Sequence, residues 1–188
     1  MSDPVTAIEP PLPEQVVAFW REAGPRAWFS AKPEFDAAIR GGFEPLHHAA
    51  ARGELGTWGE AAQGSLALLL LLDQFPRNLY RGSAHAFATD PLARRIAGAA
   101  LAAGHDAQVD YALRPFFYLP FEHSEAMADQ DRAVTLFEAH GDADTLKYAR
   151  VHRDVIARFG RFPHRNTALG RETTPEETAF LASGGFRG

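Results

Sequence analysis

The chain has 188 residues, 24 of them acidic and 19 Lys or Arg, and its formal net charge is −5. Because it contains no Cys, disulfides, zinc–thiolate sites, iron–sulfur clusters and Cys nucleophiles are excluded. Hydrophobic residues make up 46% and charged residues 23%, which excludes an intrinsically disordered chain, and the negative charge argues against a nucleic-acid coat.

The first elements along the chain are predicted to be helices. Residues 1–13 contain Pro and acidic side chains without a basic-then-apolar pattern, so we expect an extended segment and no signal peptide. Apolar residues within 16–23 follow the spacing of one helix face, and Gly24-Pro25 ends that helix. The spacing of Thr57–Glu60 predicts a capping box for the next helix.

The longest apolar run comes next, at residues 66–72. A bilayer-spanning helix needs roughly 20 apolar residues, so these seven predict a helix buried on all sides in a soluble, cytoplasmic protein without a membrane partner. Asp90-Pro91 predicts a helix cap, followed by an apolar stripe that ends at Gly104. A second capping box lies at Thr174–Glu177.

No stretch shows the alternating pattern of β-strands or an Asn-Gly hairpin turn. We therefore predict an all-α protein of seven to nine helices, each of about 8–16 residues, joined by short loops. With no linker and no low-complexity tract, residues 1–188 are expected to form a single helical domain.

One motif occurs twice, at residues 73–78 and 160–166, and places Phe75 and Phe162 before proline. Proline disfavours the α conformation of the preceding residue, so each Phe-Pro is predicted to end a helix before an Arg and an Asn. The repetition indicates either two related corners of a helical solenoid or a chance similarity.

The first polar cluster comprises Asp73, Gln74, Arg77 and Asn78. Its simpler interpretation is an ion pair between Asp73 and Arg77, four residues apart, at the end of a helix. However, these side chains follow a buried apolar run, so they must emerge from the core, and we also interpret them as a polar corner that faces a ligand.

The second cluster, Glu122, His123 and Glu125, follows an aromatic run. A His flanked by carboxylates can have a raised pKa and can act as an acid or a base. The alternative is the start of a helix, where the two Glu side chains would favour the positive end of the dipole.

The third cluster spans residues 150–171 and holds six Arg against the single acid Asp154, a local charge of +5. His152 lies on the apolar face of a predicted helix, which is typical of a hydrogen-bonded core histidine but also allows it to face a groove. Beyond that helix, four residues could clasp a carboxylate or phosphate, or could simply cap the helix end: Arg161, His164, Arg165 and Asn166.

Several sharper signals are missing. The sequence has no Gly-rich phosphate loop, no G-x-S-x-G, no H-E-x-x-H and no EF-hand loop, and its single Glu-x-x-His at residues 44–47 contains a proline. We therefore predict neither a metal site nor a cofactor, and whether the chain is an enzyme stays open.

Longer motifs carry a family resemblance over nearly the whole chain. They include Val17–Trp20, Leu71–Gly82, Ala86–Asp90, Tyr118–Glu125, His152–Asp154, Arg158–Asn166 and Thr174–Glu177. In these motifs the chain resembles the bacterial family called domain of unknown function 924, which is placed among tetratricopeptide-repeat-like helical folds. The resemblance implies an all-α, right-handed solenoid or α–α superhelix, and it implies no activity.

We favour a binding module whose Arg-, His-, Asn- and Glu-lined groove takes a small anion or a peptide. The alternative is a metal-independent hydrolase or transferase with His123 or His152 as acid/base, assisted by Glu125. It requires the three clusters to converge around one site. RNA contact through the Arg-rich segment is the least favoured hypothesis, and a homo-oligomer stays open.

Overall fold

Helices account for all regular structure in residues 12–188, the part of the chain that the computed structural model describes. Eight α-helices in this part have eight or more residues, which is within the predicted number, but two of them exceed the predicted length of 16, with 19 and 17 residues. The all-α prediction is confirmed. Their bounds are α1 (Pro13–Ala23), α3 (Pro33–Ala51), α4 (Ala62–Leu69), α6 (Asp90–Ala102), α7 (Pro115–Glu122), α8 (Met127–His140), α9 (Ala143–Phe159) and α10 (Pro175–Ala182). Two shorter helices are α2 (Pro25–Trp28) and α5 (Phe75–Leu79).

The predicted extended segment 1–13 lies outside the described residues except for its last two positions. Leu12 is the N-cap of α1, and Pro13 already begins that helix. The predicted stop is confirmed, because α1 ends at Gly24, whose φ of 72° suits glycine.

Of the two predicted capping boxes, one is present and one is not. The Thr174 side chain accepts from the backbone of Glu177, and the Glu177 carboxylate accepts from the Thr174 N–H at 2.8 Å. The Thr57–Glu60 box is wrong, because these residues form a 3-10 turn and Ala61 is the N-cap of α4. The residue spacing was compatible with a cap, but the chain makes a separate turn before the helix begins.

The leucine run forms a fully buried central helix, as predicted. Leucines 66 and 68–72 are at most 3% exposed. The helix does not end at Phe75-Pro76, which corrects the prediction for the first Phe-Pro. Instead α4 passes into a π-helical turn at Leu70–Gln74 and then into α5, and Phe75 keeps a helical φ of −60°. The wider π turn accommodates the proline without breaking the helix.

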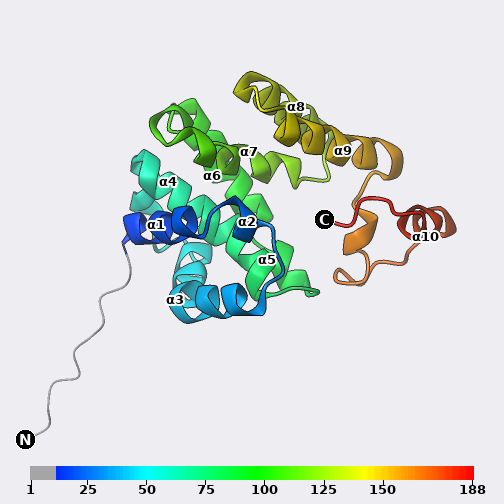
Figure 1. The fold of residues 1–188 in the computed structure, drawn as a ribbon, viewed down its shortest axis with the longest axis horizontal. Helices are drawn as coiled ribbons and strands as arrows, with labels where there is room; N and C mark the ends of the chain where they lie inside the picture. Colours follow the sequence, from blue (N-terminus) through cyan, green and yellow to red (C-terminus); the bar gives the residue numbers. More distant parts are fainter. Residues whose placement is uncertain (1–11) are drawn as a thin grey trace, which may run out of the picture.

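The helix of the leucine run lies against several other helices (Figure 1). α4 packs against α1, α6 and α7, while α3 packs against α5. Further along the chain, α6, α7, α8 and α9 each pack against the next, and α8 and α9 lie together at the top right of the view. This succession is compatible with a tetratricopeptide-repeat-like arrangement, whose right-handed superhelix stays a prediction.

Two apolar cores result. The larger one contains the central leucines and a group of aromatic rings, in which the Trp28 indole donates to the Trp20 carbonyl at 2.6 Å. The smaller one contains Val155, Ile156 and Phe162 and receives Phe180 from α10. No helix within residues 12–188 is long and apolar enough to cross a membrane.

The predicted faces of α6 and α9 are each slightly misplaced. On α6 the sequence predicts a buried stripe of Leu92, Ile96, Ala99 and Ala103, but the fully buried residues are Ala93, Ala97 and Ala100. On α9 the predicted face is Tyr148, Val151, Val155, Ile156 and Phe159 with His152. His152, Val155 and Ile156 are buried as expected, but Tyr148 is 58% exposed and Ala149 is buried instead. Small alanines allow neighbouring helices to approach closely, so the close contact follows alanine rather than the larger apolar side chains.

Candidate functional site

Asp73 and Asp90 are connected through one arginine. Asp73 lies in the π turn and is 1% exposed, and Arg77 follows one turn later with its Nη1 3.4 Å from Asp73 Oδ1. The same guanidinium donates to both carboxylate oxygens of Asp90 at 3.0 Å each. Such a fork-to-fork pair fixes geometry as well as charge. The predicted Asp73–Arg77 pair is therefore present, but Arg77 binds Asp90 more closely.

His123 follows the end of α7 and contacts the same carboxylate. Its Nδ1 lies 2.8 Å from Asp73 Oδ1, so the carboxylate orients the ring and Nε2 remains for another partner. Burial, and then the positive charge of Arg77, lowers the pKa of His123. Burial works to raise the pKa of Asp73, but the charge of Arg77, the contact with His123 and the hydrogen bond from Gln74 together outweigh it and keep this carboxyl ionised. The pair is thus a neutral imidazole beside an aspartate.

Arg165 brings the third cluster to this place. Its Nη1 donates to the His123 carbonyl at 3.0 Å and lies 3.7 Å from Asp90 Oδ2. Its guanidinium carbon lies 4.6 Å from the ring of Phe87 and 4.4 Å from that of Phe162. Burial, and then the neighbouring charge of Arg77, lowers the pKa of Arg165 to about 10.

The Nε of Arg165 is buried, and within residues 12–188 no atom accepts a hydrogen bond from it. A buried donor without an acceptor is costly and rare, and a ligand acceptor would remove that cost. The Nε atoms of Arg114 and Arg171 are also buried without an acceptor in these residues, and Arg165 is the one of the three that contacts His123 and Asp90.

The two Phe-Pro motifs therefore meet in space. Arg77 from the first and Arg165 from the second both approach Asp90, and both lie over Phe87. Their backbones differ, because the first motif continues a helix while Phe162 is extended with φ −89° and ψ 107°. The repeated residues thus supply two arginines to one carboxylate from unlike turns.

A second carboxylate–histidine pair lies beside the first. Glu122 Oε1 is 3.0 Å from His152 Nδ1, which is also 2.9 Å from the Tyr148 carbonyl. The rings of His123 and His152 are 6.3 Å apart between centroids. The helix-start interpretation of this segment is wrong, because Glu122 is the last residue of α7. α7 already begins at Pro115, so the aromatic run before Glu122 lies inside this helix.

Other predicted site residues have different partners. Gln74 donates to the Asp73 carboxylate, whereas Asn78 donates to Asp36 at 2.7 Å. Glu125 accepts from both guanidinium nitrogens of Arg171, at 2.7 and 2.9 Å. The structure thus keeps Gln74 in the cluster, directs Asn78 away from it, and places Glu125 at its edge.

The carboxylate of Glu177 on α10 accepts hydrogen bonds from two further predicted site residues. Arg161 donates to both of its oxygens, at 2.6 and 2.8 Å, and Asn166 donates to it at 3.1 Å. These two residues therefore hold α10 in place and do not reach the Asp73–Arg165 cluster.

The +5 segment is neutralised by the rest of the fold. Each of its six arginines lies within 4 Å of a carboxylate from outside the segment. The pairs are Arg150–Glu138, Arg153–Asp131, Arg158–Glu176, Arg161–Glu177, Arg165–Asp90 and Arg171–Glu125. Because the charge is used internally, the segment does not present the basic surface that RNA contact requires.

Asp90, Phe87 and Arg171 are the site residues that sequence reasoning missed. Asp90 resembled a helix cap, but it is the first residue of α6, and its carboxylate binds Arg77 instead of the helix backbone. An Asp before Pro91 fits both roles, so only its contact with Arg77 in the structure shows which role Asp90 has.

Within residues 12–188, no group of three or more His, Asp or Glu side chains is placed to hold a metal ion.

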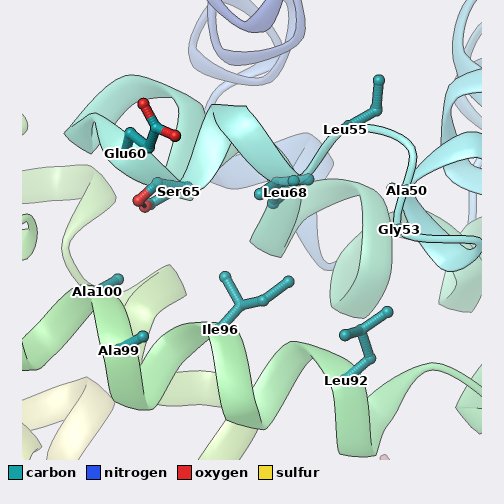
Figure 2. A pocket seen from close by; sticks show the side chains of 12 residues that line it. Ala50, Gly53, Leu55, Glu60, Ser65, Leu68, Leu92, Ile96, Ala99 and Ala100 are labelled. Carbon is teal, nitrogen blue, oxygen red and sulfur yellow. Dashed lines mark hydrogen bonds between the residues drawn. The ribbon is translucent and has the colours of Figure 1, made fainter.

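A separate hollow of about 440 Å³ lies between the start of α4 and α6 (Figure 2). Leu92 and Ile96 on α6 face Leu68 across it, and Glu60 and Ser65 lie at one end. None of its lining residues belongs to the charged cluster. A second hollow, of about 520 Å³, is lined by Arg161 and Arg171, which pair with Glu177 and Glu125 outside the cluster. Convergent charge, rather than cavity size, therefore marks the candidate site.

The lowered pKa of His164, the neighbour of Arg165, predicts how stability depends on pH. Burial, and then Arg165, lowers the pKa of His164 to about 3, whereas an unfolded His titrates near 6.5. Between these values the unfolded state binds a proton that the folded state does not, so stability falls as pH falls. The slope reaches about 1.4 kcal/mol per pH unit for one proton.

We expect the unfolding free energy of His164→Gln to fall less steeply than that of the wild type between pH 6 and 4.5. The difference in slope should be at most that of one proton, about 1.4 kcal/mol per pH unit. Urea unfolding at four pH values measures this slope. Exposed His85 offers a matched control in His85→Gln, which should keep the wild-type slope. Equal slopes for His164→Gln and the wild type would contradict the buried position of this ring.

A family model and a solved structure match the chain. The family model described as bacterial protein of unknown function (DUF924) matches residues 16–185. A solved structure of a protein of unknown function from Agrobacterium tumefaciens is 53% identical and superposes with a TM-score of 0.88, covering 91% of this chain and 97% of that one. No curated protein matches the chain. The chain therefore belongs to the DUF924 family of bacterial proteins of unknown function.

Proposed function

We propose that this protein is a cytoplasmic binding module whose ligand is a small anion, or the anionic group of a peptide, held between His123 and Arg165. The observation that carries this proposal is the buried Nε of Arg165, which no atom of residues 12–188 accepts from. A carboxylate or phosphate oxygen is the acceptor that a guanidinium binds best.

The electrostatics of the cluster support an anion. The pKa values of His123, His164 and Arg165 are all lowered, first by burial and next by a neighbouring arginine. Burial is the first cause of each shift, so these groups lie where a hydrogen bond between a cation and an anion is strong. A bound anion would complete the pairing of Arg165, whose distance of 3.7 Å to Asp90 is long for a hydrogen bond.

We expect inorganic phosphate to raise the melting temperature of the wild type, by several degrees at a concentration of about 100 times Kd. Arg165→Met keeps an apolar stem between the two phenylalanines and should abolish the effect. Arg153→Met is the matched control, because Arg153 is 40% exposed and binds only carboxylates of the surface. Thermal unfolding with and without phosphate gives the shifts, and isothermal titration gives the affinity.

If Arg165→Met does not fold, His123→Gln tests the same site through titration calorimetry, because it alters the other side of the proposed contact. A wild type that binds neither phosphate nor a small carboxylate such as acetate contradicts the proposal. Retention of wild-type affinity in Arg165→Met contradicts it as well.

A second candidate, a metal-independent hydrolase or transferase, is favoured by the 2.8 Å contact between Asp73 and His123. A carboxylate that holds Nδ1 leaves Nε2 as a general base. Glu122 holds Nδ1 of His152 in the same way, but His152 is less suited to this role because Phe186 packs on its ring. Turnover of a phosphomonoester that is lost in His123→Gln would favour the enzyme over the binding module.

A further inference from the structure

Phe186 covers one end of the candidate site. After α10 the chain runs back towards the body of the molecule, below α9 in the view of Figure 1. The ring centroid of Phe186 lies 4.3 Å from that of His152, 5.3 Å from His164 and 6.2 Å from Phe162. All three contacts are with residues of the third cluster or its immediate neighbours.

Phe186 follows α10 in a short segment that is bound to the helix by the Arg187 side chain, which donates to the Leu181 carbonyl. The last backbone hydrogen bond runs from Gly185 N to Phe180 O, and no backbone hydrogen bond joins residues 186–188 to the rest of the described chain. Gly184 has a φ of 83°, a conformation that glycine adopts without strain. The ring can therefore leave its place by rotation about Gly184 and Gly185 while α10 stays bound through Glu177.

The place that Phe186 fills is suited to an aromatic group beside an anion. The ring of Phe162 lies 6.2 Å from that of Phe186 between centroids, and the guanidinium carbon of Arg165 lies 4.4 Å from the same ring. His164 touches both phenylalanine rings and carries a buried Nδ1 without a partner in residues 12–188. An aromatic anion could thus put its charge at Arg165 and its ring where Phe186 lies.

We propose that Phe186 occupies an aromatic subsite of the anion site, and that the ligand is an anion bearing an aromatic ring that binds by displacing Phe186. This inference rests on the proposed anion site. The competing interpretation is that Phe186 only completes the smaller apolar core, since it also packs near Val155 and Ile156. The two differ in the effect that removing the ring has on binding.

The experiment titrates inorganic phosphate and phenyl phosphate into the wild type and Phe186→Ala by calorimetry. We expect phosphate to bind both proteins alike, and phenyl phosphate to bind Phe186→Ala about tenfold more tightly than the wild type, because the opened subsite buries its ring. Phe180→Ala is the matched control. Phe180 belongs to the same small core but packs on Phe159, away from the histidines, so its removal should leave both affinities unchanged.

The outcomes separate this inference from the proposed function. If phosphate binds neither protein, the anion site itself is wrong. If phosphate binds but phenyl phosphate gains nothing in Phe186→Ala, or gains equally in Phe180→Ala, the aromatic subsite is wrong and the anion site stands.

Proton NMR of the wild type gives a second test that does not depend on a variant folding. Phenyl phosphate should shift the ring protons of His152 and His164 more than phosphate does, because Phe186 leaves them. Identical shifts with the two ligands would overturn the inference.

Discussion

Replacing Asp73 by alanine is expected to lower the free energy of unfolding by about 3 kcal/mol at pH 7. The carboxylate is 1% exposed and accepts from Gln74, orients His123 and lies 3.4 Å from Arg77. Its removal leaves a buried guanidinium with Asp90 as its remaining carboxylate partner and a histidine without its acceptor. Urea unfolding followed by circular dichroism measures the loss.

Asp131→Ala is the control, because Asp131 pairs with Arg153 at the surface and is 58% exposed. An exposed pair of this kind contributes less than about 1 kcal/mol. If both variants lose a similarly small free energy of unfolding, Asp73 is not a buried, charged centre of the network. This outcome would also remove the structural basis for placing His123.

The loss in Asp73→Ala also has an expected pH dependence. Although burial raises the pKa of Asp73, Arg77, His123 and Gln74 together lower it below the value of an unfolded Asp, near 3.9. The unfolded state therefore binds a proton first, and the stabilisation by Asp73 is present above pH 4 and is lost on acidification. The difference between wild type and variant should accordingly shrink below pH 4, whereas it should stay constant between pH 5 and 8.

Helix positions in this chain were predictable where the signal was local. Residues 16–23 and 66–72 and the capping box at Thr174 depend on periodicity, burial or a contact three residues away, and each is confirmed. Phe75-Pro76 was misjudged because a π turn absorbs the proline. That turn is stabilised by packing around the central leucines, and no local pattern in the sequence indicates it.

The candidate site was predictable in its residue types but not in its pairing. Polar residues directly after apolar runs identified Asp73 and His123, and the structure brings them together across 50 positions. Arg161 was grouped with Arg165 because the two are close in sequence, yet they point to different carboxylates, Glu177 and Asp90. Which acid each arginine meets is decided by how α6 and α10 pack, and a single sequence does not contain that information.

Gly64→Ala is expected to destabilise the protein by about 3 kcal/mol. A Cβ at this position would lie 2.0 Å from the carbonyl oxygen of Trp58 and 2.7 Å from its carbonyl carbon. Both neighbours are backbone atoms of the turn before α4, so no side chain can rotate to make room. Alanine favours helix by about 1 kcal/mol over glycine, and this gain is too small to offset the clash.

Gly59→Ala provides the matched control for this variant, since a Cβ there would meet only Leu68 Cδ1, at an ordinary 3.9 Å. We expect it to unfold within about 0.5 kcal/mol of the wild type. Thermal unfolding of the two variants side by side measures the contrast, and a wild-type Tm for Gly64→Ala would mean that α4 and the turn are not in close contact. Because Gly59 and Ser65 line the apolar hollow, the same contact sets one wall of that hollow. The shape of the hollow therefore depends on Gly64, and no motif in the sequence indicates the importance of this glycine.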